Sequence, residues 1–212
     1  MVCTLCRSRR AKRSCPGVPG EICTLCCGQE REVSVTCPLD CEHLQDARRH
    51  EKPMPLDAAD LPHRDIQITE RFLAEREELL VFVGRTLGAA AMKTDGVTDF
   101  EVRAALDSLI RTYRTLGSGV YYESRPENAL ANRLYSAVQD GLAEYRRQEQ
   151  ERTGLPQTRD ADVLGLLVFF QRLELDRNNG RPRGRAFIGL LRSFYSEPPG
   201  EPAAASSRLV LP

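Results

Sequence analysis

All eight cysteines of this chain of 212 residues fall within its first 41 positions, and this clustering is the strongest constraint on how the N-terminal part can fold. They are Cys3, Cys6, Cys15, Cys23, Cys26, Cys27, Cys37 and Cys41. Two pairs have the Cys-x-x-Cys spacing, which lets two thiolates on one tight turn bind the same tetrahedral metal ion. Because a reducing cytosol does not keep disulfides and the first residues form no apolar export signal, we expect metal ligands rather than disulfide bridges.

Residues 1–45 are too few and too polar to fold on a hydrophobic core alone. A structural zinc ion contributes about 10–16 kcal/mol of apparent binding energy, and this becomes folding energy when the site forms only in the folded state. The sequence therefore predicts a small zinc-stabilised module at residues 1–45, which is unfolded without its metal.

Eight thiolates match the ligand number of two four-coordinate zinc ions. Neighbouring side chains of an extended chain point to opposite sides, so we assign Cys26 and Cys27 to different ions. If each Cys-x-x-Cys pair stays together, two interleaved arrangements fit. The favoured one has Cys3, Cys6, Cys23 and Cys26 around one ion and Cys15, Cys27, Cys37 and Cys41 around the other. The alternative has Cys23, Cys26, Cys37 and Cys41 around one ion and Cys3, Cys6, Cys15 and Cys27 around the other. His43 could replace Cys27 or Cys41, and the alternative is that it is a surface residue beside an exposed Glu42.

With this ligand pattern the segment resembles the two-zinc finger modules with interleaved ligands that occur in many adaptor and regulatory proteins. The resemblance covers residues 1–45 and points to no particular family. It implies binding of proteins, or in some cases of nucleic acid, and it implies no reaction. An iron–sulfur cluster also takes four thiolates, but the closely spaced cysteine run of ferredoxins is missing. We therefore expect two structural Zn²⁺ ions, since all-thiolate zinc sites are normally closed.

The rest of the chain has the apolar periodicity of helices. We expect a proline-containing linker at 46–65, an all-α domain of four to five helices at 66–196, and a disordered tail at 197–212. The predicted helices span about 69–92, 98–116, 124–152, 160–177 and 184–195. Capping boxes are expected at Thr98 with Glu101 and at Ser124 with Glu127.

Little in the helical part points to catalysis. It has no Cys, no His after position 63, no glycine-rich phosphate loop and no nucleophile elbow. An acidic cluster at Glu75, Glu77 and Glu78 is typical of a solvated helix face. We expect a protein that is not an enzyme and that acts as a protein-interaction, adaptor or regulatory module.

Two clusters of basic residues suggest an alternative, although the chain as a whole has zero formal net charge. The loop between the second and third cysteines carries Arg7, Arg9, Arg10, Lys12 and Arg13. Such a loop can contact phosphates, so the alternative function is a nucleic-acid-binding zinc finger. The loop is otherwise solvated, or it docks on the acidic middle helices of the same chain. For the second cluster, Arg181, Arg183 and Arg185, we expect a helix-to-helix turn with its arginines facing solvent.

The remaining expectations concern partners and location. Tyr121 and Tyr122, in a loop between helices, are candidate anchors for a protein partner because tyrosine combines apolar area with a polar tip. The partner is not identified by the sequence, and a homo-oligomer stays open. No apolar stretch approaches the roughly 18 residues that a membrane span needs, so we expect no membrane contact and a cytoplasmic location.

Overall fold

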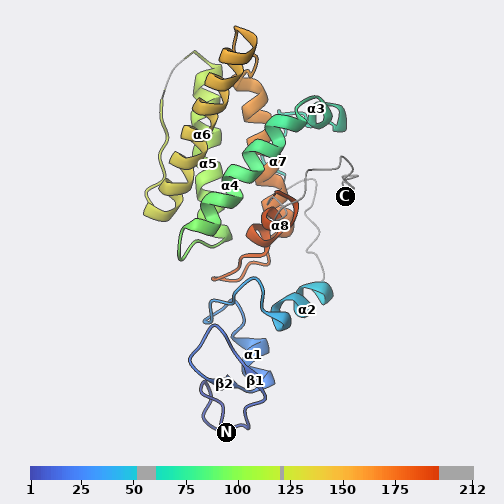
Figure 1. The fold of residues 1–212 in the computed structure, drawn as a ribbon, viewed down its shortest axis with the longest axis vertical. Coiled ribbons are helices and arrows are strands. Elements are labelled where there is room, and N and C mark those ends of the chain that lie inside the picture. The colour runs from blue at the N-terminus through green and yellow to red at the C-terminus, as the bar shows by residue number, and fades with distance from the viewer. Residues whose placement is uncertain (52–60, 120–121, 196–212) are drawn as a thin grey trace.

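The computed structural model describes residues 1–51, 61–119 and 122–195. The protein is mostly helical, with a cysteine-rich N-terminal module at one end and a helical domain at the other (Figure 1). The predicted class, a cysteine-rich module followed by an all-α domain, agrees with this architecture. The predicted tail and the linker residues 52–60 lie outside the described residues.

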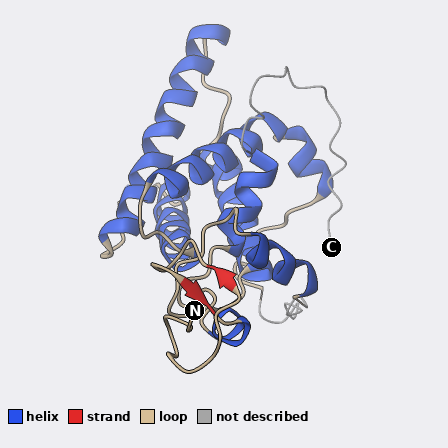
Figure 2. Cartoon of the chain, turned by 60° about the horizontal axis from the view of Figure 1, so that its bottom comes forward, coloured by secondary structure: helices blue, strands red, loops and turns tan. Residues whose placement is uncertain are grey.

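The N-terminal module contains little regular structure. Strand β1 (Arg13–Ser14) pairs antiparallel with β2 (Glu21–Ile22), and the short helix α1 (Thr24–Gln29) follows directly. These strands and the N-terminus lie in front in Figure 2, wrapped by loops rather than by a larger sheet. Helix α2 (Glu42–His50) ends the module, and it runs across residue 45, where the sequence analysis places the start of the linker.

Six helices make up the described part of the helical domain. They are α3 (Glu70–Glu75), α4 (Glu77–Lys93), α5 (Asp99–Gly117), α6 (Ala129–Thr153), α7 (Asp160–Arg177) and α8 (Ala186–Tyr195). Helix α5 packs on α6 and α7, while α4 packs on α6, α7 and α8. The four long helices therefore surround one core, and α8 covers α4 on the side of the N-terminal module (Figure 1).

The expected count of four to five helices is too low because the first predicted helix is broken at Arg76. This residue has φ −121° and ψ 23°, outside the helical region, and it separates α3 from α4. Its guanidinium lies 3.1 Å from the carboxylate of Asp162 at the start of α7. The ring of Phe72 in α3 packs on Gly165 of α7. These tertiary contacts favour a bend over the continuous helix that the local periodicity predicts.

The core follows from the helix patterns. The middle of α7 is buried on all sides, with Leu166, Leu167, Val168 and Phe170 fully inaccessible to solvent. The capping box of α5 is present as expected, with the Thr98 backbone N–H donating to Glu101 at 2.9 Å. The second expected capping box is wrong. Helix α6 begins later, and the side chain of Asn128 accepts the first free backbone N–H groups instead.

Candidate metal centre

Four cysteines converge in the N-terminal module. The sulfur atoms of Cys3, Cys6, Cys23 and Cys26 all lie within 4.8 Å of one another, and three of these side chains are buried. They are the four cysteines that the favoured arrangement places around one ion. The alternative arrangement, which joins Cys23 and Cys26 to Cys37 and Cys41, is not the one that these positions form. Four clustered sulfur donors fit the tetrahedral coordination that Zn²⁺ takes from thiolates at about 2.3 Å.

The two Cys-x-x-Cys pairs share the sequence Cys-Thr-Leu-Cys, and each forms a tight turn. In the first, the backbone N–H of Arg7 donates to the carbonyl of Cys3 at 2.9 Å, and Arg7 adopts a left-handed φ of 52°. In the second, Cys23 is the N-cap of α1, and its sulfur accepts the N–H of Cys26 at 3.4 Å. Each turn directs both sulfurs to the same point, which is why this spacing suits a shared metal ion.

Polar contacts around the four-cysteine group lower the pKa of the Cys6 and Cys23 thiols, whereas the hydrogen bond to Cys23 raises the pKa of Cys26 to about 12. Hydrogen bonds from Ser8, through its side chain and its backbone, lower the pKa of the Cys6 thiol to about 5. A hydrogen bond to the sulfur of Cys23 raises the pKa of the Arg9 guanidinium above its ordinary value. Four thiolates around one divalent cation leave a net charge of −2, so a nearby guanidinium offsets part of that charge.

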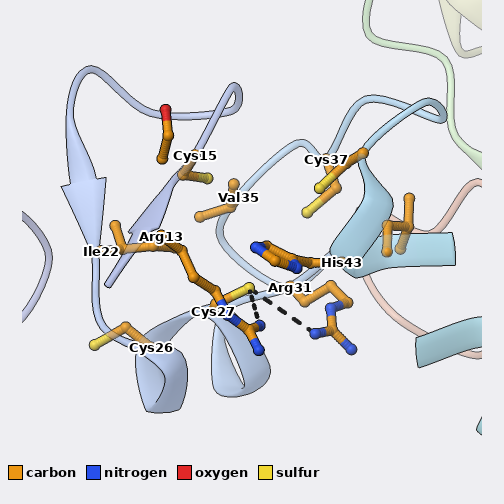
Figure 3. Close-up of a pocket in the computed structure, with 12 residues that line it drawn as sticks. Arg13, Cys15, Ile22, Cys26, Cys27, Arg31, Val35, Cys37 and His43 are labelled. Carbon is orange, nitrogen blue, oxygen red and sulfur yellow. Dashed lines mark hydrogen bonds between the residues drawn. The ribbon is translucent and has the colours of Figure 1, made fainter. Parts of the chain in front are cut away.

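The remaining four cysteines line a small cavity elsewhere in the module (Figure 3). This cavity has a volume of about 20 Å³, and its lining includes Cys15, Cys27, Cys37, Cys41 and His43. Burial raises the pKa of the Cys37 thiol. The donors here are not as closely grouped as in the first cluster, which is the one set of three or more that meets the 4.8 Å separation among the described residues.

The basic loop lies at the end of the module remote from the helical domain (Figure 1). Arg7, Arg9, Arg10 and Lys12 are exposed, whereas Arg13 is partly buried and donates to the sulfur of Cys27 at 3.2 Å. Among the described residues, no hydrogen bond or ion pair joins this loop to the helical domain. The described contacts therefore do not include the docking of this basic loop on the acidic middle helices that the sequence offered as an alternative.

A different part of the module contacts the helical domain, and it centres on Glu32, a residue that the sequence analysis missed. Its side chain is fully buried, with one carboxylate oxygen 2.7 Å from the Arg48 guanidinium. Asn179 donates to the other oxygen at 2.8 Å, and the backbone N–H of Arg185 donates to the first oxygen at 3.1 Å. The backbone carbonyl of Glu32 also accepts the N–H of Arg183 at 2.8 Å. Nothing in the surrounding sequence marks Glu32 as buried.

Apolar and ionic contacts extend this interface. Leu39 of the module is buried and belongs to the core cluster of the helical domain. It lies against Gly189 of α8, where Arg48 also approaches closely. At the edge, Arg192 of α8 pairs with Asp40 at 2.7 Å. The module is thus held against the helical domain by shared core packing and by a buried carboxylate.

The second basic cluster forms the expected helix-to-helix turn, and Arg183 is exposed, but Arg181 and Arg185 are partly buried and the turn is part of the same interface. Arg181 pairs with Glu51 at 3.1 Å, and Arg183 donates to the hydroxyl of Thr36 at 2.9 Å. The turn reaches the module because the helices on either side, α7 and α8, place it at the end of the domain that faces the module (Figure 1).

The other described candidate residues belong to the helical domain rather than to the cysteine-rich module. Tyr122 is exposed at 66 %, while Tyr121 lies outside the described residues. Glu75, Glu77 and Glu78 line an open cleft of about 620 Å³ at the break between α3 and α4. All three side chains are exposed, as expected for a solvated helix face, and they share this cleft with arginines and with Glu149 and Asp162.

Comparison of the chain with protein-family models, with curated proteins and with solved structures finds no match. The site and fold therefore define the class on their own: a mostly helical protein whose N-terminal module carries a four-cysteine group able to bind a metal ion. Of the helices in the described part of the chain, none has the length and apolar character needed to cross a lipid bilayer.

Proposed function

We propose that this protein is a non-catalytic binding protein whose N-terminal module is stabilised by two structural zinc ions. The observation that carries the proposal is the four-cysteine group at the centre of a module with almost no hydrophobic core of its own. The second ion is assigned to the cavity lined by the other four cysteines and His43. The working compartment is cytoplasmic, where free thiols persist.

Exposed apolar side chains support a role in binding proteins. Leu5 and Leu25 occupy the same place in the two Cys-Thr-Leu-Cys turns and are 38 % and 44 % exposed. The metal fixes both turns, so these side chains are presented without a cost for ordering a flexible loop. Docking of the module on the helical domain leaves both side chains exposed.

The charged cleft beside α3 supports a non-catalytic reading. The Glu75 carboxylate pairs with Arg71, and Asp162 pairs with Arg76 and Arg159. Hydrogen bonding to Arg71 holds the pKa of Glu75 below its ordinary value, and the pKa of Asp162 is also lowered, by its arginines against the opposing effect of burial. A general acid or base near neutral pH needs the opposite shift.

Metal content tests the first part of the proposal. Protein purified without added metal should contain about two zinc ions per chain by elemental analysis. Iron in place of zinc, or a folded protein without metal, would overturn it.

The binding role is tested by replacing Leu5 and Leu25 together with serine, which should abolish capture of a protein partner while zinc content stays unchanged. Leu155→Ser, at a residue 72 % exposed on the helical domain, is the matched control.

A nucleic-acid-binding function remains the second candidate, favoured by the exposed basic loop at the free end of the module. Reversing Arg10 and Lys12 to glutamate tests it without touching Arg9 and Arg13, which contact cysteine sulfurs. The matched control reverses Lys93 and Arg133, two exposed residues of the helical domain, with the same change in net charge. Salt-sensitive binding of mixed-sequence RNA or DNA that only the loop variant loses would establish this function in place of the first.

A further inference from the structure

We propose, on the basis of the two-zinc module proposed above, that the second metal centre is formed by Cys15, Cys37, Cys41 and His43, and that Cys27 stays outside it. The centre is then a three-sulfur, one-nitrogen zinc site rather than a second four-sulfur site. Four observations carry this assignment: the packing of the cysteines, the position of His43, the partners of Cys27 and the size of the cavity.

The packing of the module separates Cys27 from Cys37 and Cys41. Cys37 is buried with Val35 and Leu44, and Cys15 and Cys41 pack against this small cluster. Cys15 packs against the cluster of the first centre as well, whereas Cys27 packs against that first cluster alone. The three sulfurs of the second centre therefore share one apolar surround, to which Cys27 does not belong.

His43 is placed as a ligand by the start of α2. Cys41 is the N-cap of this helix and His43 lies in its first turn, so one helix end fixes both side chains. The imidazole ring extends into the cavity that the cysteine side chains line (Figure 3). Its nearest ionic neighbour is the Glu42 carboxylate, at 3.7 Å, beyond hydrogen-bonding distance. A neutral imidazole nitrogen is an ordinary ligand of zinc in sites with three cysteines.

Cys27 has other partners. Its sulfur accepts a hydrogen bond from Arg13 at 3.2 Å and lies 3.9 Å from a guanidinium nitrogen of Arg31 (Figure 3). Two guanidinium groups can satisfy this sulfur in place of a metal ion, whereas Cys23, with its guanidinium partner Arg9, lies among three other sulfurs. Its neighbour Cys26 belongs to the first centre, and the turn of α1 keeps the two side chains apart.

The cavity between these donors matches one ion. Its volume of about 20 Å³ exceeds the roughly 10–15 Å³ that a single water molecule needs, so one ion fits between the donors. Binding of an ion would draw the donors to zinc–ligand distances of about 2.0–2.3 Å.

Metal analysis of the full-length chain and its variants tests the assignment. The wild type and Cys27→Ser should each contain about two zinc ions, whereas His43→Asn and Cys37→Ser should each contain about one. The conservative variant His43→Cys should restore the second ion. With Co²⁺ in place of zinc, the His43→Cys variant should show stronger thiolate-to-metal absorption than the wild type, because a fourth sulfur replaces the nitrogen. The Cys27→Ser variant should have the same spectrum as the wild type.

The outcomes separate this inference from the function that it rests on. If Cys27→Ser loses an ion and His43→Asn keeps two, Cys27 is the fourth ligand, and the two-zinc module stands without the present assignment. Two ions in both variants, or one in both, also overturn the assignment. If the wild type itself holds one ion, and Cys37→Ser holds one as well, the second centre is absent and the two-zinc proposal fails with it.

Discussion

Glu32 shows how much a single side chain contributes to the way this molecule is assembled. A fully buried carboxylate is costly unless its oxygens are satisfied, and here Arg48, Asn179 and a backbone N–H satisfy them. Its backbone has a left-handed φ of 54°, an uncommon conformation for a glutamate, and this conformation accompanies its insertion between the two halves.

Glu32→Gln should destabilise the zinc-loaded protein by about 3 kcal/mol, because removing one partner of a buried ion pair leaves the other uncompensated. The free energy of unfolding, from denaturant titration, measures the effect. Asp46→Asn is the control, since the pair of Asp46 with Arg49 is largely exposed and such pairs contribute about 0–1 kcal/mol. Equal effects of the two substitutions would show that Glu32 does not stabilise the docked state.

Asp99 is a second buried carboxylate, and it should make stability depend on pH. It accepts the backbone N–H groups of Phe187 and Ile188 at the start of α8, but burial raises its pKa from 3.8 to about 7, with Glu174 and Glu32 adding to the rise. The folded state then holds a proton that the unfolded state loses near pH 4. Stability from this group is therefore complete below pH 4 and is lost as the pH rises toward 7.

Asp99→Asn removes this titration. The free energy of unfolding of the wild type, minus that of the variant, should fall between pH 6 and pH 7 and become flat above about pH 7.5. Using the difference cancels any pH dependence of metal binding, which both proteins share. A difference that stays constant, or that rises with pH, would contradict a raised pKa at Asp99.

At the scale of elements, the contact between α3 and α7 depends on residue 165 being a glycine, which has no side chain to collide with Phe72. A Cβ added at Gly165 would lie 2.6 Å from the end of the Phe72 ring and 3.1 Å from a second ring atom. Gly165→Ala should therefore displace α3 and destabilise the protein by about 1–3 kcal/mol, even though alanine favours the helix. Gly117→Ala in α5 meets no atom within 4 Å and is the control. Thermal unfolding measures both, and an effect in the control as large as at Gly165 would argue against close packing of α3.

Local patterns predicted these elements unevenly, for physical reasons. The capping box at Thr98 and the buried run of α7 follow from residues close in sequence, and both are present. The first cysteine group was predicted in part, because the Cys-x-x-Cys spacing keeps each pair together but leaves open which cysteines the pair meets. The break at Arg76 depends on Asp162, far along the chain, and the role of Arg183 depends on Thr36. Such contacts join segments that no local pattern connects.

At the scale of the whole molecule, the cysteine-rich module and the helical domain should unfold as coupled parts. Leu39 and Glu32 belong to the module but are buried against the helices. Removing the metal with a chelator under reducing conditions should unfold the module, and the helices should then lose their contacts with Leu39 and Glu32. A loss of about 3 kcal/mol would lower the melting temperature of the helices by roughly 6–12 °C.

Circular dichroism at a helical wavelength measures this coupling, and added zinc should restore the original melting curve. A helical melting temperature that is the same with and without chelator would show that the docked module does not support the helices. The variant Glu32→Gln, in the presence of zinc, should reproduce part of the shift.

Docking also fixes a length. The exposed turns and the basic loop belong to a module that is held at a set distance from the helical domain by contacts around Glu32 rather than by a tether. A partner that touches both ends meets two surfaces at one spacing, so the second contact needs no search by a flexible linker. A partner with its own sites at another spacing gains nothing from the second surface. The residues of the interface around Glu32 thus decide which partner fits, because they set the spacing of the two surfaces without contacting the partner.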